Sequence, residues 1–440
     1  MAFSLHGVHL PHRKNTADIK PVIMEKVERV AIPMGMHIGA PATPVVKVGD
    51  HVDKGTLIGE QNGFISSPVY SSISGNVKEI SDKVGSDGKK VPVIVIEADG
   101  ENTVDKDIAP PVINSREDLI EAIKKSGIVG LGGAGFPTFV KVSAEPEKIE
   151  ELIINGAECE PYITSDSYTM TNRADDMAFA LEFFKRYLGI KKVIIGIENN
   201  KKNAIAEMKK MASANEGVSV KVLSSVYPQG GEKVLVYHLT GKVIPTGKLP
   251  LDVGSIVINC TTLAVIGEYL KTGMPLVEKC ITVDGSAVAE PKNVIAPIGA
   301  LMSDVFAFAG GFKSEPAKVI YGGPMMGVSV LDLDAPVLKN TNAILAFDEK
   351  EGKAAKETAC IRCGSCYNIC PFGISPVGIE KAYKTADAEG IKEAGALACM
   401  ECGCCAYVCP AHRPLVQTNK LAKQFLKEAR SEEKAKEDKK

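Results

Sequence analysis

The chain has 440 residues, which is too many for one compact core and favours two to four domains. Hydrophobic residues make up 45%, charged residues 24%, and the formal net charge is −2, values typical of soluble globular proteins. A charge this close to zero and an aromatic fraction of 5% without Trp argue against nucleic acid as a partner, because neither electrostatic attraction nor base stacking would be strong.

No stretch reaches the roughly 18 uninterrupted apolar residues that a membrane-spanning helix needs. The first residues, MAFSLHGVHLPHRK, lack the apolar core of a secretory signal. We therefore expect a chain that stays in the cytosol, where it can still dock on a membrane protein. Twelve cysteines in a reducing compartment predict metal ligands rather than disulfides.

Residues 1–110 are predicted to form an N-terminal arm followed by a small all-β unit. Short Val- and Ile-rich runs alternate with turn pairs such as Lys54-Gly55 and Ser74-Gly75. The segment resembles the barrel-sandwich fold of biotinyl and lipoyl carrier domains. The hairpin that carries the modified lysine in those domains reads Gln61-Asn62-Gly63-Phe64-Ile65 here, without a lysine. A structural or docking module is therefore expected, and a swinging-arm carrier is the weaker alternative.

Residues 111–275 are predicted to form a Rossmann-like α/β domain. Asn114-Ser115 marks the start of an amphipathic helix over 116–126. Apolar runs predict strands at 151–156, 191–197, 218–225 and 254–260, and helices at 166–188, 200–213, 231–240 and 262–271. Strands that alternate with helices favour a mainly parallel sheet.

Residues 276–346 change character and predict a small α+β unit. The segment contains CITVDG, a helix expected at 299–309, and KVIYGGPMMG. The charged run 347–358 is expected to be a linker into a last unit, 347–440, which ends in a solvated helix rich in Lys and Glu.

Nine of the twelve cysteines lie between Cys360 and Cys409, in two C-x-x-C-x-x-C-x-x-x-C-P runs. In two-cluster ferredoxins the fourth cysteine of each run binds the other cluster. The spacing therefore predicts two [4Fe–4S] clusters, one bound by Cys360, Cys363, Cys366 and Cys409, and the other by Cys399, Cys402, Cys405 and Cys370. A pair of zinc sites is the weaker alternative, because each run already holds four cysteines and ends in Pro.

The residues between these cysteines predict the surroundings of the clusters. Cys404 is out of register with both runs, and we expect it to bind no iron. A dry apolar shell around the clusters is predicted from Ile361, Ile374, Leu397, Met400 and Val408.

A glycine-rich segment, GLGGAGFPT at 130–138, is the second candidate site. Glycines let the backbone approach a ligand and turn its N–H groups toward phosphate oxygens, although a plain tight turn explains such a segment equally well. The segments NGAECEP (155–161), YPQGGEK (227–233) and NCTTL (259–263) each lie at the end of a predicted strand. Ligands bind at this edge of open α/β sheets, so a nucleotide or flavin site is predicted there.

These segments resemble the flavin and NADH site of the 51-kDa subunit of respiratory complex I, and residues 280–330 resemble the β-grasp (SLBB-like) unit that follows it. With a barrel-sandwich unit before them and a two-cluster ferredoxin unit after them, the whole chain resembles the C subunits of Rnf complexes. Those complexes couple electron transfer between ferredoxin and NAD⁺ to ion pumping.

The resemblance implies which residues contact the cofactors. FMN contacts are implied for Gly130, Gly132, Gly133, Gly135, Asn155, Asn259 and Thr262. NAD(H) contacts are implied for Phe136, Lys141, Glu158, Glu160 and Glu232, with Glu158 and Glu160 as the candidate catalytic residues.

The expected function follows from these parts. A nicotinamide passes two electrons as a hydride and a cluster accepts one, so a flavin belongs between them. The resemblance implies an NAD(H)-dependent, membrane-associated electron-transfer subunit on the cytoplasmic side of the membrane. Its implied partners are NADH, the membrane subunits of the same complex and ferredoxin-type carriers. The alternatives are a flavin-dependent cobalamin reductase, which places its ferredoxin domain first, and a non-catalytic electron-wire subunit.

Overall fold

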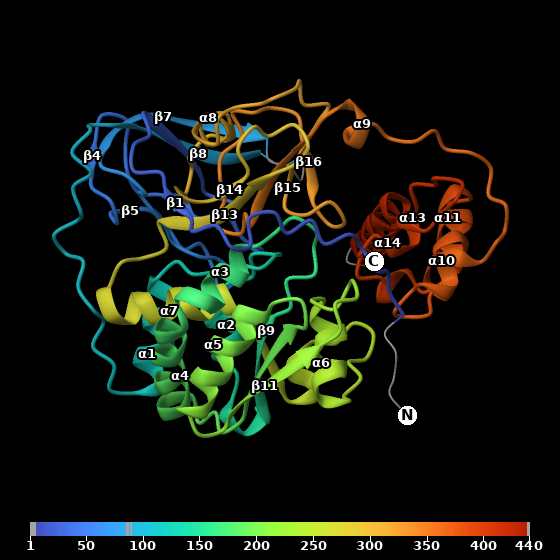
Figure 1. Cartoon of the computed structure of the whole chain (residues 1–440), viewed down its shortest axis with the longest axis horizontal. Coiled ribbons are helices and arrows are strands. Elements are labelled where there is room, and N and C mark those ends of the chain that lie inside the picture. Colours follow the sequence, from blue (N-terminus) through green and yellow to red (C-terminus); the bar gives the residue numbers. More distant parts are fainter. Residues whose placement is uncertain (1–5, 85–87, 89, 438–440) are drawn as a thin grey trace.

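The computed structural model describes residues 6–84, 88 and 90–437. Its strands form four sheets, and the C-terminal helices form a lobe beside them (Figure 1). In Figure 1 the N-terminal β unit and the six-stranded sheet lie at the top, the α/β unit lies below them, and the red C-terminal lobe lies to one side. The predicted multidomain α/β and α+β fold is confirmed, whereas the domain boundaries stay predictions.

The N-terminal β unit consists of two small sheets, with strand orders β2-β8-β7-β4 and β3-β5-β6. Because side chains alternate along a strand, Ile32, Ile58 and Ile94 point inward and are fully buried. The strands are β2 (Arg29–Pro33), β3 (Thr43–Pro44), β4 (His51–Val52), β5 (Leu57–Glu60), β6 (Val69–Tyr70), β7 (Gly75–Val84) and β8 (Lys90–Ala98). The segment 61–65 lies in the loop between β5 and β6.

The α/β unit is built on a parallel sheet of order β11-β10-β9-β12. Its strands are β9 (Glu151–Gly156), β10 (Val193–Glu198), β11 (Val218–Leu223) and β12 (Ser255–Asn259). Its helices are α1 (Arg116–Lys125), α2 (Thr138–Val142), α3 (Ser165–Asn172), α4 (Ala174–Leu188), α5 (Lys202–Ser213), α6 (Glu232–Thr240) and α7 (Cys260–Thr272). Strand β10 is buried along its whole length, as expected for a parallel strand covered by helices.

One predicted helix of this unit is wrong. The sequence predicts a continuous helix over 166–188, whereas α3 and α4 are separate and Arg173 lies between them with φ −124° and ψ 28°. The Arg173 guanidinium donates to Asp176 at 2.9 Å and to Glu268 of α7 at 2.6 Å. These contacts fix α4 against α7. The sequence gives no sign of the break, because Arg is a good helix former and apolar periodicity does not report polar contacts between helices.

The next unit is a mixed sheet of order β1-β14-β13-β17-β15-β16. Its strands are β1 (Val22–Ile23), β13 (Glu278–Asp284), β14 (Lys292–Pro297), β15 (Lys318–Tyr321), β16 (Val328–Val330) and β17 (Ala343–Phe347). Helix α8 (Met302–Phe308) packs on its core through the buried Phe306. Strand β1 comes from the N-terminal arm and pairs in parallel with β14, so the start of the chain completes a sheet that is otherwise formed about 260 residues later.

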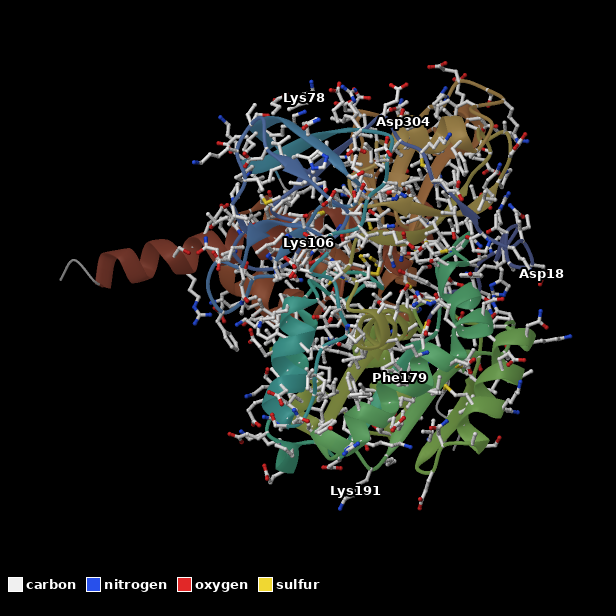
Figure 2. The ribbon with its side chains drawn as sticks, turned by 90° about the vertical axis from the view of Figure 1, so that its left-hand side faces the viewer. Asp18, Lys78, Lys106, Phe179, Lys191 and Asp304 are labelled. Atoms are coloured by element: carbon white, nitrogen blue, oxygen red, sulfur yellow. The ribbon has the colours of Figure 1, made fainter. Side chains whose placement is uncertain are left out.

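The C-terminal lobe is helical and has an internal repeat. Its helices are α10 (Ser365–Asn368), α11 (Pro376–Lys384), α12 (Ala388–Glu393), α13 (Cys404–Tyr407) and α14 (Leu415–Glu437), and a short helix, α9 (Glu349–Gly352), lies in the linker before them. In Figure 2 the red helix α14 extends beyond the body of the molecule. Across the described parts of the chain, no helix is both long and apolar enough to cross a bilayer.

The arm that precedes β1 connects these units. In Figure 1 the dark-blue segment crosses the middle of the molecule toward the red lobe. His6 Nδ1 lies 3.0 Å from the carbonyl oxygen of Asn368 in the C-terminal lobe. Val8 pairs with Tyr227 of the α/β unit, and the hydroxyl groups of Thr16 and Thr164 are 2.5 Å apart. The N-terminal arm, residues 6–16, therefore joins the lobe to the α/β unit.

Candidate functional site

The glycine-rich loop lies at the carboxyl edge of the parallel sheet, between β12 and the N-terminal β unit. The backbone N–H of Gly130 donates to the carbonyl of Phe136 at 2.8 Å, which closes the loop. The N–H of Leu131 donates to Thr262 Oγ1 at 2.9 Å. Asn259 caps α7 by accepting from the N–H of Thr262, so Asn259 and Thr262 lie directly beside the loop, as the sequence predicts.

Parts of the loop are open to a ligand. Gly132 and Gly133 are exposed, and a methyl group added to Gly132 would lie 2.6 Å from the amide nitrogen of Asn259. A methyl group at Gly133 would meet nothing within 4 Å, so there is space beside the backbone. Backbone N–H groups beside open space suit a phosphate, and the residues present therefore fit the phosphate of FMN.

Two other units support this loop. The N–H of Ile38, in the N-terminal β unit, donates to the carbonyl of Gly135 at 3.1 Å. The amide of Asn340, which precedes β17, donates to the carbonyl of Gly133 at 2.6 Å. Gly135 has φ +68°, a conformation that favours glycine. The shape of the loop therefore depends on contacts between three units, and no local sequence signal identifies Ile38 or Asn340.

The remaining predicted contact residues lie at the ends of neighbouring strands. The Asn155 amide, near the end of β9, donates to the carbonyl of Gly230 at 2.9 Å. The Lys141 ammonium donates to Glu232 at 2.8 Å, and Glu232 begins α6. The carboxyl edge thus brings together the glycine-rich loop, the 155–161 segment and the 227–233 segment, as the alternation of strands and helices predicts.

Glu158 and Glu160 are both held below the surface of this edge. Burial raises the pKa of Glu158 to about 7, and the ammonium groups of Lys14 and Lys201 oppose that rise. Burial also raises the pKa of Glu160 to about 7, although the N–H groups of Met325 and Met326 donate to its carboxylate and favour the charged form. Raised carboxyl pKa values are common where a site must control charge.

Cysteines of the two runs lie beside each other in the C-terminal lobe. We call Cys360–Cys370 the outer run and Cys399–Cys409 the inner run. Burial raises the pKa of the Cys405 thiol to about 12, and three neighbouring sulfur atoms add to the rise: Cys402, Cys399 and Cys370. Burial likewise raises the pKa of Cys366, with Cys409 as its sulfur neighbour. Cys370 therefore lies near the inner run and Cys409 near the outer run, while the crossed ligand sets stay a prediction.

The backbone of the two runs repeats after 39 residues, the interval from Cys360 to Cys399. Arg362 and Glu401 occupy matching places with φ 58° and 62°. Each donates its N–H to the first sulfur of its run, at 3.4 Å in both cases. Such N–H···S contacts and a thiolate-rich donor set fit an iron–sulfur cluster.

Among the residues that the structure describes, no group of three or more His, Cys, Asp or Glu side chains converges closely enough to hold one metal ion.

The residues of the predicted apolar shell differ in solvent exposure. Ile374 is buried, but Ile361 is 66% exposed and Leu397 is 55% exposed. Sequence pattern alone does not show which of these side chains the rest of the protein covers. Cys404 is 1% exposed, and its sulfur lies 3.9 Å from the carbonyl oxygen of Tyr227.

The inner run packs on the nucleotide edge of the sheet through Tyr227. The Tyr227 hydroxyl donates to the carbonyl of Cys402 at 2.6 Å. Three residues later, the N–H of Gly230 donates to the sulfur of Cys159, and a methyl group on Gly231 would lie 2.3 Å from the Met400 side chain. The predicted flavin edge and the inner run are therefore in direct contact.

Sequence reasoning missed several residues of the site. They are Lys14, Asp166, Lys201 and Asn340, together with the contact that Tyr227 makes to the inner run. Each acts through a contact between segments far apart in the chain, so periodicity and spacing carry no signal for them.

Family models match four segments of the chain. An RnfC barrel sandwich hybrid domain matches residues 3–101, and a Nuo51 FMN-binding domain matches residues 123–268. An SLBB domain matches residues 280–329, and a 4Fe-4S dicluster domain matches residues 353–410. FMN and [4Fe–4S] clusters are therefore supported as the cofactors, in agreement with the sequence prediction.

A solved structure gives the same picture of the fold. An NAD⁺-reducing [NiFe]-hydrogenase in the H₂-reduced state superposes with a TM-score of 0.50 and 19% identity, over 69% of this chain and 63% of that one.

Curated relatives match most of the chain. The C subunit of the Na⁺-translocating ferredoxin:NAD⁺ oxidoreductase complex of Acetobacterium woodii is 43% identical over 85% of both chains. The C subunit of the proton-translocating complex of Clostridium ljungdahlii is 40% identical, over 87% of this chain and 86% of its own. The C subunit of the ion-translocating oxidoreductase complex of Rhodobacter capsulatus is 38% identical, over 98% and 84%. The chain belongs to the family of C subunits of ion-translocating ferredoxin:NAD⁺ oxidoreductase (Rnf) complexes.

Proposed function

We infer that the chain is the NADH- and FMN-binding electron-transfer subunit of an ion-translocating ferredoxin:NAD⁺ oxidoreductase. The observation that carries this inference is the contact between Tyr227 and Cys402, which joins the nucleotide edge of the sheet to the inner cysteine run. Buried cluster ligands beside a flavin edge provide the short separation that single-electron transfer requires. The cobalamin reductase alternative is not favoured, because its ferredoxin domain precedes the barrel-sandwich unit.

Different residues of the carboxyl edge bind different parts of the two cofactors. We propose that Gly130, Gly132, Gly133 and Gly135 surround the FMN phosphate with backbone N–H groups, and that Asn155, Asn259 and Thr262 orient the rest of the flavin. Phe136, Lys141, Glu158, Glu160 and Glu232 form the NAD(H) side. A bound flavin supplies the exchange between two-electron and one-electron chemistry. The protein contributes position and charge: Lys141 is already oriented by its ion pair with Glu232.

The eight cysteines of the two runs are the proposed cluster ligands. One set is Cys360, Cys363, Cys366 and Cys409, and the other is Cys399, Cys402, Cys405 and Cys370. Cys402 and Cys405 are buried, whereas Cys360 and Cys363 are exposed. The inner run therefore exchanges electrons with the flavin edge, and the outer run exchanges them with a partner protein.

The partners and the location follow from the family. The relatives are named as subunits of ion-translocating complexes. We propose that the chain docks on the membrane subunits of its own complex at the cytoplasmic face of the membrane. Ferredoxin-type carriers then exchange electrons with the chain through that complex. The exposed outer run is the surface at which the chain contacts its electron-transfer partner.

Anaerobic purification with flavin extraction and iron analysis tests this function. About eight irons, acid-labile sulfide and about one FMN per chain are expected, since two cubane clusters hold four irons each. NADH should then bleach the flavin and cluster absorbance. Zinc, or the absence of sulfide, would exclude the clusters. Full iron content without any response to NADH would instead support a non-catalytic electron-wire subunit.

A further inference from the structure

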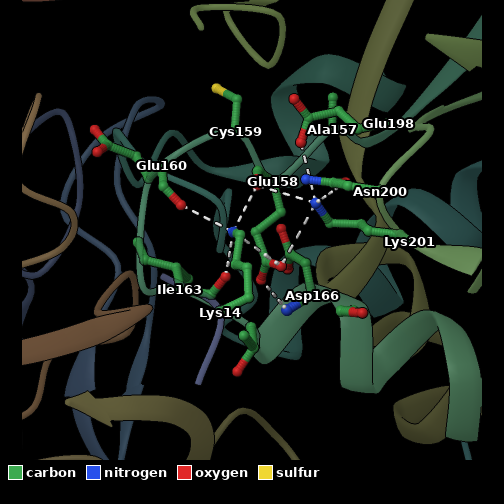
Figure 3. A network of polar contacts seen from close by, with 12 residues as sticks. Lys14, Ala157, Glu158, Cys159, Glu160, Ile163, Asp166, Glu198, Asn200 and Lys201 are labelled. Carbon is green, nitrogen blue, oxygen red and sulfur yellow. Dashed lines mark hydrogen bonds and ion pairs between the residues drawn. The ribbon is translucent and has the colours of Figure 1, made fainter. Parts of the chain in front are cut away.

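A buried ionic network links the N-terminal arm to the nucleotide edge (Figure 3). Lys14 enters from the arm, Glu158 and Glu160 come from the segment after β9, and Lys201 comes from the segment after β10. None of the predicted cofactor contacts includes Lys14, and the arm itself has no place in the electron path described above.

The Lys14 ammonium group is wrapped by the 158–163 turn. It donates to the carbonyl oxygens of Glu158 at 2.8 Å, Glu160 at 2.8 Å and Ile163 at 2.5 Å. An ammonium group has three donors, so this turn uses all of them. The conformation that presents Glu158 and Glu160 to the nucleotide edge therefore depends on a cation from the start of the chain.

The Glu158 carboxylate has one oxygen without a hydrogen bond. Oε1 accepts from the N–H of Asp166 at 2.7 Å, whereas Oε2 is buried and has no hydrogen-bond partner. Oε2 lies 3.7 Å from Lys14 Nζ and 4.0 Å from Lys201 Nζ. Burying a carboxylate oxygen without a hydrogen-bond donor is unfavourable in free energy. A bound ligand that donates a hydrogen bond to this oxygen would remove that penalty.

Lys14 and Lys201 are not equivalent partners of Glu158. Lys201 forms a closer ion pair with Glu198, at 3.0 Å. Among the described residues, Glu158 is the one carboxylate that pairs with Lys14. Removing Lys14 would therefore leave Glu158 with a cation that is already bound by another carboxylate.

The network continues from Glu158 to the flavin side. Asp166, whose N–H binds Glu158, accepts through its carboxylate from the Asn259 amide at 2.8 Å and from the Thr261 hydroxyl at 2.6 Å. Asn259 lies against Gly132 of the glycine-rich loop. A change in the charge or position of Glu158 can thus reach both sides of the proposed site.

We propose that Lys14 is a positioning residue of the nucleotide site, which fixes the 158–163 turn and places a cation beside the Glu158 carboxylate where a dinucleotide binds. This inference rests on the proposed function. The charged groups that face Glu158 are Lys14 from the arm, Lys201 and its partner Glu198 beside β10, Asp166 on α3 and Lys279 on β13.

The direction of the pH effect follows from these charges. Burial raises the pKa of Glu158, and Lys14 opposes that rise. Without the Lys14 charge the pKa of Glu158 rises further, so the carboxylate becomes protonated at a higher pH than in the unchanged protein. Binding that needs the carboxylate is then lost as pH falls through neutrality.

The test is calorimetric binding of NAD⁺ to the oxidised, cofactor-loaded protein from pH 6 to 8, beside NADH turnover. Lys14→Met is expected to weaken binding roughly tenfold at pH 7, the lower range for loss of an outer-shell partner. Its loss of binding on acidification should move to higher pH. Lys14→Arg should return the pH dependence toward that of the unchanged protein. It restores the positive charge beside Glu158 even if the 158–163 turn is not held in the same conformation.

Two controls make the result decisive. Lys20→Met removes an exposed lysine from the segment that follows the arm, and it should change neither binding nor its pH dependence. Glu158→Gln should weaken binding and remove the part of the pH dependence that Lys14→Met shifts, whereas the part that comes from Glu160 should remain. Flavin and iron content verify that each variant is assembled.

Unchanged binding in Lys14→Met, or a uniform loss at every pH that Lys14→Arg does not correct, would overturn the proposal. A loss of flavin and iron from every Lys14 variant, with normal pH dependence in the protein that remains, would also overturn it. Failure of the unchanged protein to bind NAD⁺ would instead contradict the proposed function.

Discussion

The two cysteine runs share spacing and backbone geometry but occupy opposite environments. Arg362 and Glu401 adopt the same left-handed conformation and donate to the first sulfur of their runs at the same distance. Yet Cys402 is 8% exposed and lies against Tyr227, whereas Cys360 and Cys363 are exposed. The local chain determines the backbone geometry of each run. The docking of the lobe on the α/β unit determines which run is buried against the carboxyl edge, and on this difference rests the proposal that the inner cluster faces the flavin and the outer one a partner.

Matching positions in the two repeats also differ in chemistry. Asn419 of α14 donates its amide to the sulfur of Cys399 at 3.5 Å. The matching residue 39 positions earlier is Glu380 of α11, which pairs with Arg413 and Lys384. An amide donor near one cluster and a neutralised carboxylate near the other should give the clusters different reduction potentials.

The largest expected effect comes from removing one ligand from each run. Cys402→Ser and Cys363→Ser should each lower the iron content from about eight to about four. Cys402→Ser should slow cluster reduction by NADH by more than about 100-fold, beyond the usual cost of an outer-shell change. Cys363→Ser should leave NADH reduction of the inner cluster intact and abolish transfer to a ferredoxin. Anaerobic stopped-flow absorbance distinguishes the two, and identical behaviour would contradict the assigned order.

Tyr227→Phe tests the contact between the inner run and the flavin edge. It removes a buried donor from the Cys402 carbonyl, which should cost about 1–3 kcal/mol in stability or docking of the lobe. Denaturant unfolding of the cofactor-loaded protein measures this. Tyr407→Phe, which changes a tyrosine that is 54% exposed, is the matched control and should stay within about 0.5 kcal/mol of the unchanged protein. Equal effects of the two substitutions would show that the contact is not specific.

A charge on the exposed face of the outer run tests the exit point. Ile361→Glu should slow electron transfer to the acceptor protein about tenfold, equivalent to about 1.4 kcal/mol, and leave NADH-driven cluster reduction unchanged. Val48→Glu, on the N-terminal β unit, changes a similarly exposed residue far from the lobe and should have no effect. If Val48→Glu slows transfer and Ile361→Glu does not, the partner docks elsewhere.

The smallest expected effect concerns the potential of the inner cluster. Asn419→Leu removes an N–H···S contact and should lower that potential by about 60 mV or less, since 59 mV corresponds to a tenfold change for one electron. Redox titration followed by electron paramagnetic resonance measures each cluster separately. A shift of the outer cluster instead would contradict the assignment of Cys399 to the inner one.

The sequence predicted those parts of the molecule that local pattern encodes. The strand ends predicted the carboxyl edge, and Asn114-Ser115 marked α1, which Ser115 caps with Asp118 in a capping box. The cysteine spacing predicted the presence of iron–sulfur clusters, while the two ligand sets stay a prediction. The break at Arg173 and the exposure of Ile361 and Leu397 were not predictable, because both depend on which surfaces other units cover. Lys14 was missed for the same reason, since its three acceptors lie more than 140 residues away.

The N-terminal arm has a consequence for how the protein is made. Chains are synthesised from the N-terminus and domains generally fold as units while synthesis proceeds. The partners of the arm are Asn368, Tyr227 and the 158–163 turn, so they leave the ribosome long after the arm itself. Most of the arm can pair only after the α/β unit has been made, and the contact of His6 with Asn368 can form only after the C-terminal lobe has been made. A bulky tag fused ahead of this segment would therefore be expected to disturb maturation more than one placed beyond α14.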